Sequence, residues 1–566
     1  MAPKPFSLSS TASLAPFPIP IPFRKPYVFR VSIRRPDVIT CTQSWTESDG
    51  AGAAAPTRGD IFIQRQHSAA AMAAAPKKKR HKKEKVVKFS TLAPSCYGCG
   101  APLQSSEMDV PGYVDQETYD LKRKHHQLRT VLCGRCRLLS HGHIITAVGG
   151  HGGYSAGKQF VSAEELREKL SHLRHVKALI VKLVDVVDFN GSFLARIRDL
   201  AGANPIILVV TKVDLLPKET DFNCVGDWVV EATAKKKLNV LSVHLTSSKS
   251  LVGISGVLSE IQKQKKGSAN VGKSAFINAL LKTMSNKDPV AAAAIRYKPI
   301  QSAVPGTTLG PIQIDAFLGA GKMYDTPGVH LHHRQAAVVH SEDLPALAPQ
   351  SRLRARVFPN SQMDVDKQMA DRVRSSGLTG FTIFWGGLVR IDVQKTVFVL
   401  LMTCFLFEKF HPHPHPQALR ETRLMFYGPN AVQVHIVPTE EADEFYNREV
   451  CVLLTPPTGK EKAEAWTGLE TKRHINLKYT NIERPACDVA VSGLGWISVE
   501  PVDITLKSSD HSVEEGFGEL DFVVHVPKPV EIFVRSPMPV GKAGAKWYEY
   551  RELTEAECEI RPKWFF

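Results

Sequence analysis

Three long apolar stretches, all rich in β-branched residues, lie in the middle of this chain. They are ALIVKLVDVVDF, NPIILVVTKVDLL and LNVLSVHLTSSKS, within residues 178–250. Near-continuous apolar runs of this kind are typical of strands buried on both faces of a parallel sheet. FVSAEELREKLSHLRHV, at 160–176, predicts an amphipathic helix with Ser162 as its N-cap and Glu165 completing a capping box. We therefore expect an α/β domain whose parallel sheet carries helices on both faces.

The C-terminal part of the chain has a different pattern, in which strand-like segments are separated by glycines. These segments lie at 380–394, 486–501 and 515–541. They predict a mainly β C-terminal domain. Trp385 and Trp496 lie in two of the segments. Stacking on nucleic acid and burial in the core both explain aromatic residues on strands, and we favour the core.

Between these regions, GSANVGKS at 267–274 matches the phosphate-loop pattern G-x-x-x-x-G-K-[ST]. Its glycines let backbone N–H groups surround phosphate oxygens, Lys273 would reach the β- and γ-phosphates, and Ser274 would bind Mg²⁺. SAFINALLKTM, which follows, predicts the helix that such a loop needs. The preceding GVLSEIQKQKK is polar and helix-like, where a buried strand is normal. The sequence therefore predicts that this strand is missing.

Length and composition describe a multidomain protein with an excess of positive charge. The 566 residues suggest two to four domains, and 72 Lys and Arg against 56 Asp and Glu give a net charge of +16. Such an excess suits a polyanionic partner, with RNA as the first candidate. No apolar run reaches the roughly 18–20 residues that a membrane span needs, so we expect none.

The N-terminal segment concentrates the positive charge. Residues 1–36 contain six Lys and Arg and no Asp or Glu, which is typical of an organelle transit peptide; an inert, disordered terminus is the alternative. A linker rich in small residues extends to residue 75. PKKKRHKKEKVVK, at 76–88, cannot pack and stays solvated unless it meets phosphate. We interpret it as an rRNA-binding tail, with a nuclear localisation signal and a solubilising spacer as alternatives.

Two CxxC pairs follow, and they predict a Cys₄ zinc site. The four candidate ligands are Cys96, Cys99, Cys133 and Cys136. Paired CxxC motifs suit tetrahedral zinc, and four thiolates leave no open coordination position, so the zinc would be structural. Unpaired or redox-active cysteines are the alternative. His141 and His143 come shortly after and could compete as ligands, although exposed histidines are the commoner case.

Two motifs at the ends of apolar stretches predict recognition of guanine. TKVD supplies Thr211, Lys212 and Asp214, and TSSK supplies Ser247 and Ser248. An Asp at this place can accept two hydrogen bonds from guanine N1 and N2, which adenine cannot supply. In parallel sheets, ligands gather at the carboxyl ends of the strands, where both motifs are expected. A turn-forming Asp without ligand is the alternative.

Two further motifs come after the phosphate loop. PGTT offers Thr307 and Thr308 to Mg²⁺ and the γ-phosphate. DTPG offers Asp325 to Mg²⁺ through water, and the N–H of Gly328 to the γ-phosphate. Each tetrapeptide is a weak signal by itself, but four in the correct relation to a phosphate loop are a strong one.

The order of the motifs is that of a circularly permuted GTPase, because TKVD and TSSK precede the phosphate loop. With two CxxC pairs in front and LVDVVDFNGSF opening the domain, residues 90–566 resemble the YqeH-like ribosome-assembly GTPases, and among these the plant chloroplast branch of brassinazole-insensitive pale green GTPases. The resemblance implies GTP hydrolysis coupled to rRNA processing and ribosome assembly in the chloroplast stroma, with the mitochondrion as the alternative compartment. It implies GTP or GDP, Mg²⁺ and structural zinc as cofactors, K⁺ as a candidate activator, and rRNA and ribosomal subunit precursors as partners.

The family's functional positions are carried over onto matching residues of this chain. The phosphate is assigned to Gly267, Asn270, Val271, Gly272, Lys273, Ser274 and Ala275, with Thr307, Thr308, Asp325 and Gly328 from the two later motifs. The guanine base is assigned to Thr211, Lys212, Asp214, Ser247, Ser248 and Lys249. The catalytic group is Lys273, Thr308, Asp325 and Gly328, and Ser274 and Thr308 are the expected Mg²⁺ ligands.

The resemblance also sets domain boundaries. We expect a transit peptide and linker at 1–75, the basic tail at 76–89, a zinc-finger region at 90–150, the GTPase domain at 157–340 and a β-rich RNA- or ribosome-binding domain at 341–566. TVFVLLMTCFLFEKFHPHPHPQ, at 396–417, departs from the family pattern.

Two features favour other interpretations. Val329 follows DTPG, where many GTPases keep a water-orienting glutamine, so we expect slow intrinsic turnover. The polar segment before the phosphate loop favours a non-catalytic RNA-binding or scaffold protein with a degenerate GTPase domain. A nuclear GTPase is a third interpretation, which rests on the basic tail.

Overall fold

The computed structural model describes residues 94–141, 178–193, 201–264, 269–270, 274–286, 288–301, 307–317, 322–328, 331–358, 377–400, 422–459, 466–479, 484–501 and 516–566, with residues 168, 197 and 464. The chain divides into two compact units, Met1–Val87 and Lys88–Phe566, and the second contains all of these residues. The predicted leader and basic tail, the predicted helix at 160–176 apart from its helical residue Glu168, and Gly267, residues 271–273, His143 and Val329 lie outside the described residues.

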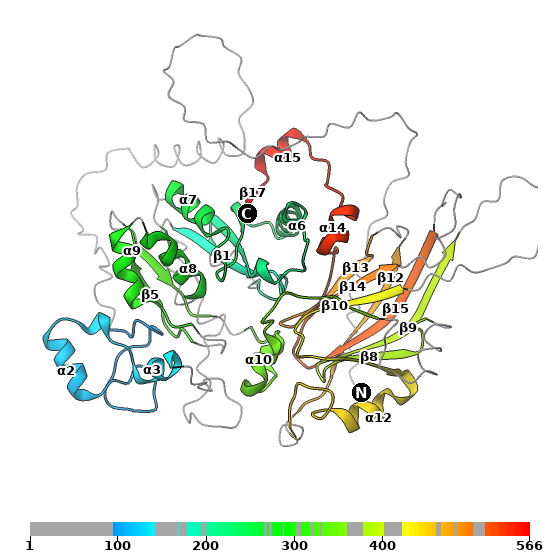
Figure 1. Cartoon of the computed structure of the whole chain (residues 1–566), viewed down its shortest axis with the longest axis horizontal. Helices are drawn as coiled ribbons and strands as arrows, with labels where there is room; N and C mark the ends of the chain where they lie inside the picture. Colours follow the sequence, from blue (N-terminus) through cyan, green and yellow to red (C-terminus); the bar gives the residue numbers. More distant parts are fainter. Residues whose placement is uncertain are drawn as a thin grey trace, which may run out of the picture. The chain divides into compact units, whose positions relative to one another are not determined.

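A parallel sheet forms from the three apolar stretches, as predicted. The strands β1 (Leu179–Asp185), β2 (Ile206–Thr211) and β3 (Val240–Leu245) pair in parallel, with β2 between the other two. Alternate residues of β2 point to opposite faces of the sheet, and each face is covered by its own apolar core. Ile207 and Val209 pack against helices α7 (Ile254–Gln264) and α8 (Ser274–Ser285), whereas Leu208 and Val210 pack against α6 (Phe222–Ala234). Helices therefore cover both faces of the sheet (Figure 1).

A strand of two residues lies inside the phosphate-loop motif. The polar segment forms α7, as its pattern predicts, and β4 (Ala269–Asn270) then pairs in parallel with Leu179 and Ile180 of β1. Strands β5 (Ile312–Asp315) and β6 (Lys322–Asp325) form a separate antiparallel pair, and β6 packs beside β4. A two-residue strand offers too few backbone groups to join β6 and β1 into one ladder. No strand is described between the end of α7 and Gly267, where residues 265–268 lie outside the described residues, so the absence of a strand before the loop stays a prediction.

The N-terminal module, residues 94–141, has two helices, α2 (Gln116–Lys124) and α3 (Gly134–Ser140). The Asp115 side chain caps α2 by accepting a hydrogen bond from the backbone N–H of Thr118 at 2.8 Å. Basic residues occupy the last turn of α2, where they favour the helix dipole. A loop and the helix α2 thus lie between the two CxxC pairs.

Two five-stranded antiparallel sheets form the C-terminal region (Figure 1). One has the order β16–β13–β14–β10–β7 and the other β11–β8–β9–β15–β12. Their strands are β7 (Arg356–Phe358), β8 (Phe381–Trp385), β9 (Val389–Leu400), β10 (Thr422–Tyr427), β11 (Val434–Pro438), β12 (Thr471–Tyr479), β13 (Cys487–Val491), β14 (Gly495–Pro501), β15 (Gly516–Val526) and β16 (Ile532–Arg535). Apolar side chains from both sheets share one core, as in a β-sandwich.

Short elements complete the described chain. They are η2 (Leu128–Thr130), η4 (Val213–Leu215), α9 (Pro289–Ala294), η5 (Ile295–Tyr297), η6 (Gln335–Ala337), η7 (Ser341–Asp343), α10 (Leu344–Leu347), η8 (Thr439–Glu441), α12 (Ala442–Glu449), α14 (Gly541–Trp547), α15 (Glu555–Ile560) and β17 (Lys563–Phe565).

The two tryptophans singled out in the sequence are core residues. Trp385 and Trp496 are both fully buried. Trp496 stacks on Tyr427 and lies against the Arg535 guanidinium, 5.5 Å from its ring centroid. Neither ring is available to stack on a nucleic-acid base, so the core interpretation is confirmed. Of the unusual segment at 396–417, the first five residues extend β9 along β15, and the rest lies outside the described residues.

The last strand of the chain leaves the C-terminal region and joins the parallel sheet. β17 pairs in parallel with β3 at the sheet's edge. The Trp564 ring lies over Gly226 of α6, where a Cβ would come within 2.4 Å of a ring carbon. The Phe565 ring stacks on His244, with the ring centroids 5.0 Å apart. The predicted boundary at 341–566 therefore does not hold for this strand, because the exposed edge of β3 accepts it.

We expect the stability of this edge to fall in acid because His244 is buried. Burial lowers the pKa of His244 from 6.5 to about 4. Between these values the unfolded chain binds a proton that the folded chain does not, so acidification favours unfolding, by about 3 kcal/mol in full. Urea unfolding at pH 7 and pH 5 measures the effect. His244→Gln should reduce the pH dependence, whereas His125→Gln, at an exposed helix end, should leave it unchanged. Equal pH dependence in all three proteins would refute this.

Candidate nucleotide site and cysteine cluster

Three oxygen-bearing side chains from distant parts of the sequence meet at one point. Ser274 begins α8, Thr308 lies between η5 and β5, and Asp325 ends β6. The Ser274 hydroxyl donates a hydrogen bond to Asp325 Oδ2 at 2.6 Å, and its oxygen lies 3.1 Å from Thr308 Oγ1. Asp325 is fully buried and Thr308 nearly so. The structure therefore brings together the three residues predicted to serve Mg²⁺.

The surroundings of this point suit a phosphate group. Ser274, the last residue of the phosphate-loop motif, starts a twelve-residue helix, as a phosphate loop requires. Ala275 lies in the first turn of that helix. Open space surrounds Gly328, where an added Cβ would meet no atom within 4 Å. Hard oxygen donors are the ligands that Mg²⁺ prefers, and here Ser274 and Thr308 could supply them.

The two predicted guanine motifs lie side by side at the carboxyl edge of the sheet. TKVD follows β2 and TSSK follows β3, and the Val213 N–H donates to the Thr246 carbonyl at 3.2 Å. Lys212 has the left-handed conformation (φ 64°), and Asp214 lies in the tight turn η4 between two buried residues. Ser247 is buried, and its hydroxyl accepts the Ser250 N–H at 3.1 Å.

The other predicted residues of this edge also lie close by. The Thr211 hydroxyl donates to the Val184 carbonyl of the neighbouring strand at 3.1 Å. Ser248 is half-buried and Lys249 is exposed in the turn after β3. Because β1, β2 and β3 are parallel, both motifs lie at the same edge of the sheet, and the carboxyl end of β1 lies there too.

Sequence reasoning missed the acidic residues at the end of β1. Asp185 pairs with Lys212 of TKVD, with 2.6 Å between Nζ and Oδ2. Burial opposes ionisation of Asp185, but the charges of Lys212 and Arg334 outweigh it, and its pKa lies below the usual value. Asp188 is buried and pairs with Arg334 at 2.8 Å; burial nevertheless raises its pKa. Two aspartates inside the otherwise apolar LVDVVDF were the available signal.

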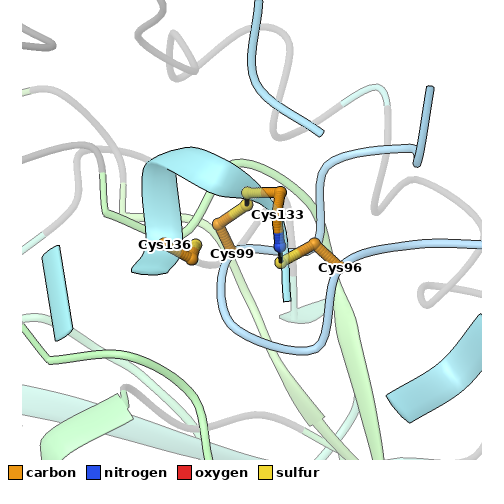
Figure 2. Close-up of side chains that lie close together, drawn as sticks. All are labelled: Cys96, Cys99, Cys133 and Cys136. Atoms are coloured by element: carbon orange, nitrogen blue, oxygen red, sulfur yellow. Dashed lines mark hydrogen bonds between the residues drawn. The ribbon is translucent and has the colours of Figure 1, made fainter. Parts of the chain in front are cut away.

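The four predicted zinc ligands converge in the N-terminal module (Figure 2). Cys96 and Cys99 come from a tight turn, whereas Cys133 and Cys136 lie at the start of α3. All four are buried and unbridged, and their sulfur atoms lie within 4.8 Å of one another. His141 is exposed and does not belong to this cluster. Among the described residues, these four cysteines are the group whose ligand atoms lie close enough together to hold a metal ion.

The geometry of the cysteines fits zinc. Tetrahedral zinc with Zn–S bonds of ~2.3 Å places its sulfur atoms ~3.8 Å apart. Cys99 Sγ and Cys133 Sγ are separated by 3.8 Å. Backbone N–H groups of Gly98 and Cys133 point at Cys96 Sγ from 3.4 and 3.3 Å, as donors that stabilise a thiolate do. Four thiolates and their backbone donors form a closed, structural type of site.

Comparison with known proteins decides the family. Residues 266–377 match a family described as 50S ribosome-binding GTPase, and residues 421–538 match the YqeH-like C-terminal family. Arabidopsis thaliana NO-associated protein 1, chloroplastic/mitochondrial, is 60% identical over 549 residues, which cover 92% of this chain and 91% of the relative. YqeH of Bacillus subtilis is 27% identical over 447 residues, covering 78% and 98%. This chain belongs to the YqeH-like family of GTPases.

Membership of this family confirms the predicted resemblance. The sequence identities to individual relatives show which branch of the family this chain resembles most among those compared. The brassinazole-insensitive pale green 2 protein of Arabidopsis thaliana is 28% identical over 349 residues, covering 57% of this chain and 45% of that one. The chain is thus more similar to NO-associated protein 1 than to the branch named from the sequence. In the described part of this YqeH-like chain, no helix is both long and apolar enough to cross a bilayer.

Proposed function

We propose that this protein is a circularly permuted GTPase that binds GTP with Mg²⁺ and carries zinc as a structural element. The convergence of Ser274, Thr308 and Asp325 is the observation that carries the proposal. These residues come from three separate motifs of the GTPase pattern, and an oxygen cluster at a helix N-terminus suits Mg²⁺ and phosphate. The permuted order is supported by the sheet, in which strands bearing TKVD and TSSK precede β4 in sequence.

Each motif has a distinct role in this proposal. Lys273 and the backbone of the phosphate loop bind the β- and γ-phosphates, with the positive end of α8 behind them. Ser274 and Thr308 supply oxygen atoms to Mg²⁺, Asp325 acts on it through water, and the Gly328 N–H contacts the γ-phosphate. Asp214 reads guanine N1 and N2. Val329 cannot orient the attacking water, so intrinsic turnover is slow and an RNA surface, a partner or K⁺ accelerates it.

The proposed cellular role is ribosome assembly and rRNA processing in an organelle. The matching family is described as 50S ribosome-binding, and the two Arabidopsis thaliana relatives are named chloroplastic or chloroplastic/mitochondrial. The transit-like leader at 1–36 and the basic segment at 76–88 agree with an organelle and an rRNA partner. We propose the chloroplast stroma, with the mitochondrion as the alternative, and ribosomal subunit precursors as the partners.

A non-catalytic RNA-binding or scaffold protein is the second candidate. The two-residue β4 favours it, because this strand lies inside the phosphate-loop motif and joins the loop to β1 by few hydrogen bonds. In this case the GTPase domain would keep its fold, since β1, β2 and β3 do not depend on β4. Binding of GTP would then be weak or lost.

Nucleotide binding by the purified protein separates the two candidates. We expect saturable binding of GTP in the presence of Mg²⁺, with ATP at least about a hundredfold weaker, because adenine cannot donate to Asp214. Isothermal titration calorimetry with both nucleotides measures this. Lys273→Ala removes a charged hydrogen bond to phosphate and should weaken GTP binding roughly tenfold or more, whereas the exposed Lys249→Ala should have a smaller effect. Absence of saturable GTP binding in the unaltered protein would support the scaffold candidate.

A further inference from the structure

The cysteine module is hydrogen-bonded to the segment that carries Thr307 and Thr308. The Leu309 N–H donates to the carbonyl of Cys99 at 2.7 Å, and the Gly310 N–H approaches the same oxygen at 3.1 Å. On the other side of the segment, the Ile300 N–H donates to the Gly98 carbonyl at 3.1 Å. One CxxC turn thus binds the chain at Ile300 and again at Leu309, immediately after the second threonine.

Close packing makes this contact rigid. Gly100 and Gly310 approach so closely that a Cβ on either would lie 2.3 Å from the carbonyl oxygen of the other. Gly100 also has a positive φ of 72°, so no other residue fits there without strain. Ile300 and Leu309 pack onto the buried core of the module. Leu309 and Gly310 therefore cannot move away from the module without breaking hydrogen bonds and exposing apolar surface.

Arg135 adds a contact from inside the cluster. It lies between Cys133 and Cys136, is 6% exposed, and donates from Nη1 to the Thr307 carbonyl at 3.3 Å. Arg137, two residues later on the same helix, is exposed. Burial of a guanidinium costs free energy unless its N–H groups are used, so this placement favours a specific hydrogen-bonding role for Arg135.

The path from the cysteine cluster to the candidate Mg²⁺ ligands is short. Cys99 contacts Leu309, Leu309 follows Thr308, and Thr308 Oγ1 lies 3.1 Å from Ser274 Oγ. We propose that the CxxC turn and Arg135 hold Thr308 at the Mg²⁺ position, so that zinc occupancy of the cysteine cluster and binding of GTP favour one another. This inference rests on the proposed function. Arg135 is a positioning residue in it, because it acts through the threonine segment.

A direct consequence is discrimination between GTP and GDP. The threonine hydroxyl is needed when Mg²⁺ and the γ-phosphate are both present, and GDP lacks the γ-phosphate. Fixing Thr308 beforehand therefore favours GTP more than GDP. Because linkage is reciprocal, bound GTP must stabilise the arrangement in which the module retains its metal.

Nucleotide affinities of two arginine variants test the positioning role. We expect Arg135→Gln to weaken binding of Mg²⁺ with the slowly hydrolysed analogue GTPγS about tenfold, while GDP affinity changes less than about twofold. Arg137→Gln is the matched control and should change neither affinity. Zinc content of one equivalent in each protein, measured by mass spectrometry, verifies that the module is folded. Equal loss for both nucleotides, or no loss, would overturn the positioning role.

The reciprocal measurement follows zinc release to a chromogenic chelator. We expect GTPγS with Mg²⁺ to slow release at least about fivefold relative to GDP, and Thr308→Ala to abolish the difference. Identical release rates in the unaltered protein would overturn the coupling. Binding of GDP to the unaltered protein separates failure of the coupling from failure of the proposed function. If GDP binds normally and the zinc release rates are equal, only the coupling fails. If neither GDP nor GTPγS binds, the proposed function fails and the coupling fails with it.

Discussion

Replacing Asp214 by Asn is expected to weaken GTP binding about a thousandfold and to allow xanthosine triphosphate to bind in its place. The carboxylate accepts two hydrogen bonds, from guanine N1 and N2, each contributing about 1.5–3 kcal/mol because the acceptor is charged. An Asn amide turns one acceptor into a donor, which opposes guanine N2 but suits the oxygen that xanthine carries at that position. Competition of GTP and xanthosine triphosphate against a fluorescent nucleotide measures both effects.

The position of Asp214 makes this substitution a sharp test. The turn η4 is fixed by the buried Val213 and Leu215 and by the hydrogen bond from Val213 to Thr246, so Asn should not disturb the backbone. Asp221→Asn is the matched control, since it makes the same change of charge in the same connection and Asn keeps its N-capping bond to Asn223. A D214N protein that still preferred GTP to xanthosine triphosphate would refute the assignment of this motif to guanine.

Removing zinc, or one of its ligands by Cys133→Ser, is expected to unfold the module at 94–141. Structural zinc contributes apparent binding free energies of about 10–16 kcal/mol in small domains, which is more than this module can replace. Its other apolar core consists of a few small or medium side chains, and α2 buries none of its residues. Limited proteolysis, with zinc content measured on the same samples, gives the readout: cleavage within 94–141 should appear when zinc is lost.

Cysteine substitution needs a control that leaves the cluster intact. Cys558 is exposed and lies in α15, outside the cluster, so Cys558→Ser should keep one zinc and protease resistance. The unaltered protein, Cys133→Ser and Cys558→Ser are compared by sodium dodecyl sulfate electrophoresis of the digests and by mass spectrometry of the metal. If the zinc-free protein kept a protease-resistant module, the metal would not be a structural element.

Local patterns were sufficient for most elements of the fold. The apolar stretches around Leu179, Ile206 and Val240 predicted strands, and the structure places strands there because both of their faces are buried. Helical spacing of apolar residues after Ser274 predicted α8 in the same way. In the C-terminal region, alternating strand patterns predicted β strands but not their arrangement. Pairing order in an antiparallel sandwich depends on contacts between distant residues, as between Thr422 and Pro501.

The phosphate loop illustrates what local reasoning does not reveal. Polar residues before Gly267 indicated a helix correctly, and from this the absence of a strand before the loop was inferred. A two-residue strand inside the motif has no periodicity that a sequence pattern could reveal, yet Ala269 and Asn270 pair with β1 because the neighbouring edge is free to accept them. In the same way, Lys563–Phe565 carries no strong strand signal, and its pairing with β3 depends on the edge that it meets.

The sequence by itself determined which GTPase and cysteine motifs this chain carries and in which order they stand. The identities and order of the phosphate loop, TKVD, PGTT, DTPG and CxxC motifs predict the phosphate, guanine, Mg²⁺ and zinc ligands, since each motif is a local arrangement of backbone and side chain. Tertiary structure alone decided how these sites are connected. Asp185 beside Lys212, Arg135 beside Thr307 and β17 beside β3 are contacts between segments far apart in the chain. Such contacts arise from packing and edge pairing, which no local pattern of residues specifies.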